Sequence, residues 1–233
     1  MNYYHNFNTN HFKKCIQLYN SNTDISSNKI LNNDILVHTL KHYENNDLYN
    51  KYINELSDIL QHTQKKQFIP NVSEIYILSN NITILLSKLN KLIIPYFEQN
   101  IYKCYLQVID TKILNHYKNN SRQQGAFNWH YDNHPQDITN IIIYLNDVDI
   151  NSGPFQYITI NNNIIKKNFT TPAGNKNMNG FVQSNNTTIH SIIGKKGHIF
   201  YFDNNIIHRA SRVLHKKRLA LLIQVKPSLR KLY

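Results

Sequence analysis

Residues 140–160 read NIIIYLNDVDINSGPFQYITI, and this stretch contains two short runs rich in β-branched and aromatic residues, NIIIYL and GPFQYITI. Such runs are typical of β-strands, and the Asn, Asp and Ser between them are typical of a turn. Similar runs occur elsewhere in the second half of the chain: YKCYLQVID (102–110), GHIFYF (197–202) and RLALLIQVK (218–226). No long helical pattern separates them, which argues against parallel βαβ units and predicts an antiparallel sandwich or barrel, of which the jelly roll is one form.

The first hundred residues show a different periodicity, in which apolar residues return to one helical face. Two stretches carry it: Leu48, Tyr52, Ile53, Leu56, Ile59 and Leu60, and then Leu85, Leu89, Leu92 and Tyr96, where Pro95 disturbs the end. There is neither a repeat nor an obvious linker. We therefore expect one domain over residues 1–233, with mainly helical support (1–100) packed outside a jelly-roll core (101–233). The expected fold class is α+β with a mainly β core.

The composition restricts the class of protein. The 233 residues are 41% hydrophobic, enough for one sizeable core, but no apolar run approaches the roughly 18 residues that span a membrane. Cys15 and Cys104 are too few for a disulfide framework and fit a reducing compartment. The N-terminal stretch MNYYHNFNTNHFKK has no apolar signal core. These features predict a cytoplasmic protein without a membrane segment.

The formal net charge of +12 raises the question of a nucleic-acid partner. Asn, Lys, Ile and Tyr, whose codons are AT-rich, are all abundant, so the basic balance is explained largely by genome composition. A small-molecule substrate is therefore favoured over nucleic acid. The nucleic-acid alternative would use the C-terminal cations Arg209, Arg212, Lys216, Lys217, Lys226, Arg230 and Lys231.

The motif with the clearest chemistry is NWHYDNH, residues 128–134. In an extended segment, His130 and Asp132 point to the same side, where an imidazole and a carboxylate can bind one metal ion. A third candidate ligand, His208, follows the run GKKGHIFYFDNNII. Two histidines and one carboxylate are the ligand set of non-heme Fe(II) oxygenases, and they leave positions open for a 2-oxo acid and O2.

Arg218 lies ten residues after His208 and opens the last predicted strand, where it shares a face with Ala220, Leu222 and Gln224. A guanidinium on a mostly apolar face needs an anion if it is buried, and the far carboxylate of 2-oxoglutarate is such an anion. Three further residues are candidate contacts to this co-substrate, although packing is the favoured explanation for them: Tyr144, Asn128 and Ser211. The remaining histidines, His134, His190, His198 and His215, are expected to be structural or exposed.

Two segments resemble the phytanoyl-CoA-dioxygenase-like family of 2-oxoglutarate/Fe(II) oxygenases. WHYDNHPQDITNIIIYLNDVDINSGPFQYI (129–158) is similar to the first half of the family's catalytic core, and GKKGHIFYFDNNIIHRASRVLHKKRLALLIQ (194–224) to the second half. The resemblance covers roughly residues 125–226. It implies a double-stranded β-helix (jelly-roll) core. It also implies Fe(II) ligands at His130, Asp132 and His208, a 2-oxoglutarate anchor at Arg218, and hydroxylation that releases succinate and CO2.

The chain departs from the family's pattern in two places. The family often continues after the GP of residues 153–154 into a P-G-S-H-type turn, whereas ITINNN follows Tyr157 here, and the polar segment NKNMNGFVQSNNTT (175–188) matches nothing in it. Because Asp132 is present, the resemblance favours hydroxylation over halogenation. Two alternatives stay open: the same chemistry on nucleic acid or another polymer, and a non-catalytic jelly-roll protein or a cupin-like protein that binds another metal. The sequence predicts no oligomeric state.

Overall fold

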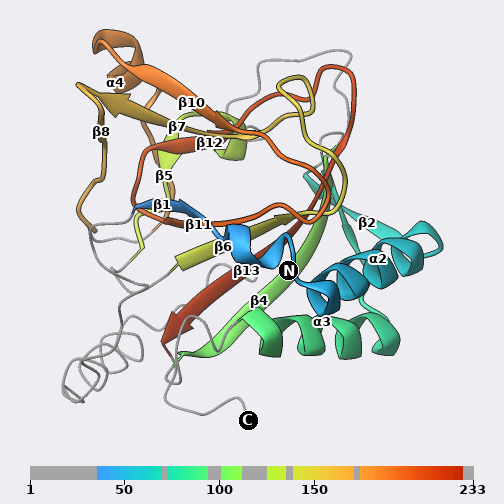
Figure 1. The fold of residues 1–233 in the computed structure, drawn as a ribbon. Coiled ribbons are helices and arrows are strands. Elements are labelled where there is room, and N and C mark those ends of the chain that lie inside the picture. The colour runs from blue at the N-terminus through green and yellow to red at the C-terminus, as the bar shows by residue number, and fades with distance from the viewer. Residues whose placement is uncertain are drawn as a thin grey trace, which may run out of the picture.

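Two antiparallel sheets face each other in the computed structural model, which describes residues 36–69, 73–93, 101–111, 125–134, 139–170 and 174–227 (Figure 1). The larger sheet has seven strands, in the order β1 (Val37–Thr39), β11 (Ile199–Asp203), β6 (Thr139–Tyr144), β13 (Arg218–Pro227), β4 (Ile101–Thr111), β3 (Ser73–Tyr76) and β2 (Lys65–Ile69). The five strand runs predicted from the sequence correspond to β4, β6, β7, β11 and β13.

The second sheet is built from shorter strands. Its order is β10 (Thr188–Ile192), β7 (Phe155–Ile160), β12 (His208–Ala210), β5 (His130–Tyr131) and β9 (Lys176–Asn177), and β8 (Asn163–Ile164) pairs with the outer part of β7. The 3-10 turn η3 (Gly125–Phe127) precedes β5. The sequence analysis missed β5 and β12 as strands because two and three residues are too few to show alternation. Both nevertheless carry a candidate metal ligand.

Strand β6 explains why the larger sheet lies in the middle of the molecule. Ile141 and Ile143 are fully buried on the face that packs against the helices, whereas Tyr144 is buried on the face turned towards the second sheet. A strand covered on both faces reads as a continuous apolar run rather than an alternating one. This is the physical reason for the sequence NIIIY.

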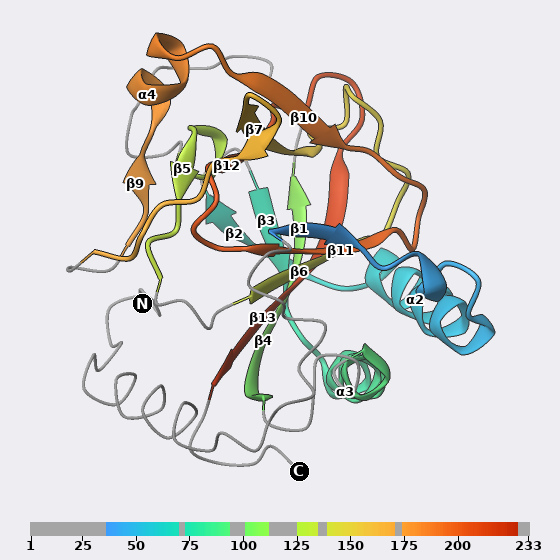
Figure 2. The same cartoon turned by 60° about the vertical axis from the view of Figure 1, so that its left-hand side comes forward.

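Helices α2 (Asp47–Gln61) and α3 (Asn80–Ile93) cover the outer face of the larger sheet, next to the short turn η1 (Lys41–Tyr43) (Figure 2). The side chain of Asn46 caps α2 by accepting a hydrogen bond from the Tyr49 amide at 2.9 Å. Leu56 and Leu60 are buried as predicted, but Leu48 is 46% exposed and Tyr49 takes the buried position. That single assignment was wrong, because the packing surface is centred one residue further along.

The first hundred residues are not purely helical. Strands β1, β2 and β3 lie within them and extend the larger sheet: β1 pairs with β11, β3 with β4, and β2 with β3. The polar segment 175–188, which had no predicted structure, contains β9 and the short helix α4 (Asn179–Ser184). The predictions for Pro95, Tyr96, Cys15, Arg230 and Lys231 fall outside the described residues.

Helix α4 covers the outer face of the second sheet, where Val182 packs with Trp129, Ile158 and Ile207 (Figure 2). The prediction of a mainly β double-stranded β-helix with helices packed on the outside is confirmed. In the part of the chain that the structure describes, no helix has the length and apolar character needed to cross a membrane.

Candidate metal centre

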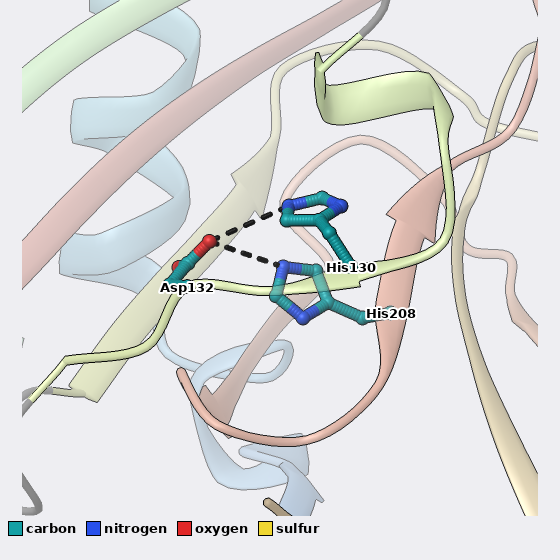
Figure 3. A group of neighbouring side chains, drawn as sticks. All are labelled: His130, Asp132 and His208. Atoms are coloured by element: carbon teal, nitrogen blue, oxygen red, sulfur yellow. Dashed lines mark ion pairs between the residues drawn. The ribbon is translucent and has the colours of Figure 1, made fainter. Parts of the chain in front are cut away.

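Three side chains converge between the two sheets: His130 from β5, Asp132 just after β5, and His208 from β12 (Figure 3). Strands β5 and β12 pair with His130 directly opposite His208. The Asp132 Oδ1 atom lies 3.4 Å from His130 Nε2 and 3.8 Å from His208 Nε2. One donor atom from each residue lies within 4.8 Å of the other two, so a single metal ion can contact all three. The structure thus brings together the three residues that the motif and its spacing pointed to.

Both histidines are held in the tautomer that a metal requires. His130 Nδ1 lies 2.8 Å from the carbonyl of Asn128, and His208 Nδ1 lies 3.0 Å from the carbonyl of Ile206. A carbonyl only accepts hydrogen bonds, so each Nδ1 carries the proton and donates it. Both Nε2 atoms therefore face Asp132, where their lone pairs could bind a metal ion in place of the contact to the carboxylate.

The carboxylate of Asp132 is oriented by a polar chain across the larger sheet. Asn140 donates to Asp132 Oδ2 at 3.3 Å, and Gln224 donates to the side-chain oxygen of Asn140 at 3.3 Å. The Asp132 amide also donates to the Asn204 carbonyl at 2.9 Å. One carboxylate oxygen is thus engaged by an amide, which leaves Oδ1 directed at the histidines.

The charges of the three groups are strongly coupled. Burial would raise the pKa of Asp132, but its hydrogen bond to His130 and the charges of His208 and His130 hold that pKa at about 2. Burial, together with the charge of His130, lowers the pKa of His208 to about 4. Burial also acts to lower the pKa of His130, but its hydrogen bond and charge attraction to Asp132 outweigh this and raise it. A carboxylate that stays ionised beside a neutral His208 favours a cationic ligand.

Aromatic rings close one side of this centre. The ring of Phe155 lies 5.3 Å from that of His208 at an angle of 21°, and the Phe202 ring lies 5.0 Å away. Both phenylalanines are buried. They fix the imidazole by packing and keep water from that side of the site.

Arg218 begins β13 on the strand face that carries Ala220 and Gln224 at alternate positions. Its Nη1 donates to the carbonyl of Gly153, and burial lowers its pKa while the Tyr144 phenol acts to raise it. Among the described residues no carboxylate pairs with this guanidinium. The Arg218 guanidinium could therefore pair with an anion from outside the described part of the chain.

Gly153 makes this arrangement sterically feasible. Its φ is +75°, and a Cβ there would lie 2.6 Å from Val213 Cγ2 and 2.9 Å from the Ser211 carbonyl oxygen. Both the left-handed backbone and the close approach exclude larger residues. The turn read from the Gly-Pro pair thus also provides the carbonyl that holds Arg218.

The three weaker candidates lie in different surroundings. Tyr144 is fully buried; its hydroxyl donates to the Ile192 carbonyl at 2.8 Å and accepts from the Phe155 amide at 3.2 Å. Asn128 supports His130 through its backbone carbonyl, whereas its side chain accepts a hydrogen bond from Asn179 at 3.0 Å. Ser211 lines a separate cavity together with Asn128. Whether any of them contacts a co-substrate stays a prediction.

Asn140, which donates to Asp132, was not predicted from the sequence as part of this site. The available signal was a polar residue at the start of an otherwise apolar strand, eight positions after Asp132. Gln224 had been placed on the face of Arg218, but its link to Asp132 depends on the pairing of β13 with β6, in which Gln224 lies opposite Asn140. His190, expected to be structural, contacts Thr159 Oγ1 at 2.9 Å and stacks on Tyr157.

Comparison with known proteins shows the fold. No family model and no curated protein sequence matches the chain. Among solved structures, the epimerase SnoN in complex with Fe3+, alpha ketoglutarate and nogalamycin RO is similar over 82% of this chain and 78% of its own, with a TM-score of 0.54 and 10% identity. HygX from Streptomyces hygroscopicus, with nickel, 2-oxoglutarate and hygromycin B bound, is similar over 78% and 81%, with a TM-score of 0.51 and 10% identity.

A third similar structure is a prolyl hydroxylase from Trichoplax adhaerens in complex with a hypoxia inducible factor peptide. It matches 92% of this chain and 91% of its own, with a TM-score of 0.50 and 11% identity. The chain thus has the jelly-roll fold of these enzymes, and inside that fold it carries a two-histidine, one-carboxylate centre.

Proposed function

We propose that this protein is an Fe(II)- and 2-oxoglutarate-dependent dioxygenase that acts on a small molecule. One observation supports this above the others: His130, Asp132 and His208 direct three donor atoms at one point, with each imidazole already in the metal-binding tautomer. A ligand set of two histidines and one carboxylate is the arrangement used by non-heme Fe(II) oxygenases.

The groups around the three candidate ligands also suit a metal ion. A divalent cation would neutralise the Asp132 carboxylate, and it would bind the Nε2 atoms of both histidines, which already face that carboxylate. The chain from Asp132 through Asn140 to Gln224 would keep the carboxylate oriented when the metal is bound.

The co-substrate 2-oxoglutarate also has a matching group in the protein, the guanidinium of Arg218. Arg218 is a permanent cation on the same inner face as Gln224, and no described carboxylate pairs with it. A planar guanidinium suits the terminal carboxylate of 2-oxoglutarate, which it can hold through two hydrogen bonds. Tyr144 lies close enough to affect the Arg218 pKa and would pack beside that carboxylate.

When Fe(II) and 2-oxoglutarate are bound, they activate O2 and oxidise a substrate C–H bond, with release of succinate and CO2. The chain's own contribution is positional. His130, Asp132 and His208 fix the metal, Arg218 orients the co-substrate, and Phe155 and Phe202 exclude water from one side. No side chain among these needs to act as an acid or a base.

The family and the type of reaction are also part of this proposal. The motifs in residues 129–158 and 194–224 favour a phytanoyl-CoA-dioxygenase-like hydroxylase. SnoN is described as an epimerase on the same fold. Product analysis should therefore look for inversion at a carbon centre as well as for inserted oxygen.

Succinate formation tests the proposal. Purified protein is incubated with Fe(II), 2-oxoglutarate and ascorbate in air, with and without a metabolite extract, and succinate is quantified. We expect succinate to form, to increase with the extract, and to disappear in His208→Ala. No succinate under any condition, from protein that is folded and loaded with iron, would contradict the proposal.

A further inference from the structure

A cavity of about 530 Å³ lies on the outer face of the second sheet, away from the metal centre. Its walls come from η3, β7, β12 and α4 and include Phe127, Trp129, Gln156, Arg209 and Ser211. The volume falls within the range of pockets that bind small molecules. The proposed reaction does not account for it, although Asn128 and Ser211, two candidate co-substrate contacts, are among its lining residues.

The sheet itself separates this cavity from the metal centre. Successive side chains of a strand point to opposite faces, so in β12 Arg209 points away from the side that His208 faces. The ring of Trp129 lies against Arg209 on that outer side. Gln156 lies opposite Arg209 in the pairing of β7 with β12. None of the three metal-ligand candidates lines the cavity. A molecule held here does not reach the metal, so this is an accessory site rather than the place of reaction.

The guanidinium of Arg209 is held rigidly in the wall. Its central carbon lies 4.3 Å from the centre of the Trp129 ring, and its Nε donates to Gln156 Oε1 at 2.8 Å. Gln156 is itself fixed, since its amide donates to Ser191 Oγ at 2.9 Å. Within the described residues, the two terminal nitrogens of Arg209 have no partner. They form a preorganised planar donor pair.

A second polar group in the wall also lacks a partner. Ser211 Oγ is buried and makes no hydrogen bond to any described residue. A buried hydroxyl without a partner is costly, and a ligand oxygen would satisfy it. Arg212 adds a further cation to the lining, and no carboxylate occurs among the lining residues that the structure describes. The polar part of the cavity is therefore suited to an anion.

The remaining wall is apolar and open to solvent. Ile150 and Leu214 line the cavity and are 57% and 53% exposed, and Phe127 lies further in. Large exposed aliphatic side chains beside the half-buried cation Arg209 are typical of a site that receives an amphiphilic ligand. The cavity therefore combines an anion site with an apolar surface.

We propose that this cavity binds a small molecule that carries a carboxylate or phosphate group on an apolar or aromatic body. The terminal nitrogens of Arg209 hold two oxygens of the anion, Ser211 donates to it, and the apolar body lies against Ile150 and Leu214. The site is separate from the proposed metal centre, and its occupancy does not depend on iron.

The protein contains its own reporter for this site, because Trp129 is the only tryptophan beside 16 tyrosines. Metal-free protein is titrated with phenyl phosphate and, separately, with benzoate, and tryptophan fluorescence is excited selectively. We expect a saturable change with at least one of these anions, and the stronger binder identifies the anion as phosphate or carboxylate. Benzyl alcohol, which has the same ring but no charge, should produce no saturable change.

Variants connect the signal to Arg209. Arg209→Gln should weaken binding roughly 10- to 100-fold, as expected for the loss of charge-assisted hydrogen bonds. Arg209→Lys should recover only part of it, because an ammonium lacks the planar donor pair. Lys196→Gln removes the same charge from an exposed position outside the lining and should bind normally. A thermal unfolding transition like that of the wild type shows that each variant is folded.

Two results would overturn the proposal. One is the absence of a saturable fluorescence change with either anion in the folded wild-type protein. The other is equal affinity in wild type, Arg209→Gln and Lys196→Gln. Since the titration uses metal-free protein, either result leaves the proposed oxygenase activity untouched.

Discussion

His130 and His208 are related by more than proximity, because each donates its Nδ1 proton to the carbonyl of the residue two positions before it. The two rings face each other across the pairing of β5 and β12, with centroids 4.4 Å apart. A shared local geometry therefore sets both tautomers. The backbone, rather than a neighbouring acid, prepares the two imidazoles for a metal.

The first prediction concerns the ligands themselves. His208→Ala should weaken Mn(II) binding, measured by calorimetry under argon, by more than the roughly 10- to 100-fold that loss of an outer hydrogen-bond partner costs. His190→Ala is the matched control, since His190 lies on the same sheet but outside the triad. Wild-type Mn(II) affinity in His208→Ala, or an equal loss in His190→Ala, would refute the assignment.

The second prediction concerns the support of Asp132. Asn140→Leu removes the amide that donates to Asp132 Oδ2 while keeping a similar volume. We expect Mn(II) affinity to fall by roughly 10- to 100-fold. Asn163→Leu, at an exposed position, should leave it unchanged. An Asn140→Leu protein that binds Mn(II) as tightly as wild type would show that the amide has no orienting role.

The third prediction concerns the co-substrate. Removing one partner of a buried, hydrogen-bonded charge pair costs about 2–5 kcal/mol, or roughly 30-fold to a few thousandfold in affinity. Arg218→Ala should weaken 2-oxoglutarate binding by this factor in Mn(II)-loaded protein, and Arg218→Lys should restore part of it. Lys216→Ala, at a 70% exposed side chain, should bind 2-oxoglutarate normally. Unchanged affinity in Arg218→Ala would exclude it as the anchor.

The fourth prediction concerns the basic surface. If the net charge of +12 reflects composition, duplex and single-stranded DNA should bind only with the dissociation constants of non-specific contact, about 10⁻⁴–10⁻⁶ M at physiological salt. Fluorescence anisotropy over a series of salt concentrations measures this. Sub-micromolar binding at that salt, together with oxidation of a base, would favour a nucleic-acid substrate.

The fifth prediction concerns the helical layer. Leu56 is fully buried between α2 and the larger sheet, so Leu56→Ala should lower the free energy of unfolding by about 2–5 kcal/mol. Leu48→Ala makes the same chemical change on the same helix at a 46% exposed position, and its effect should stay within about 0.5 kcal/mol. Denaturant unfolding compares the two, and equal losses would contradict the observed packing face.

The sequence predicts the parts of this protein that depend on local pattern. The run NIIIYL predicts a strand, and the motif around His130 and Asp132 together with His208 predicts candidate metal ligands without any knowledge of strand pairing. By contrast, the bond between Gln224 and Asn140 joins residues 84 positions apart and exists only through the pairing of β13 with β6. The register in which β13 pairs with β6 cannot be read from the local sequence of either strand.

Long-range contacts also explain why Leu48, predicted to lie on the buried face of α2, is exposed. The apolar stripe of α2 is wide enough to include both Leu48 and Tyr49, and the sheet beneath the helix decides which of them is buried. The Tyr49 hydroxyl donates to the Gly197 carbonyl at 2.8 Å, and this contact fixes the rotation of the helix. Such long-range contacts are not visible in the sequence.

The most direct test of the central claim is the visible absorption of the anaerobic protein with Fe(II) and 2-oxoglutarate. A 2-oxo acid that chelates Fe(II) through two oxygens produces a charge-transfer band that neither component shows alone. We expect this band in the wild type, its loss in His208→Ala, and its appearance in Arg218→Ala only at much higher 2-oxoglutarate concentration. A folded wild-type protein without the band, or a His208→Ala variant that keeps it, would contradict the assignment of His130, Asp132 and His208 as the iron site.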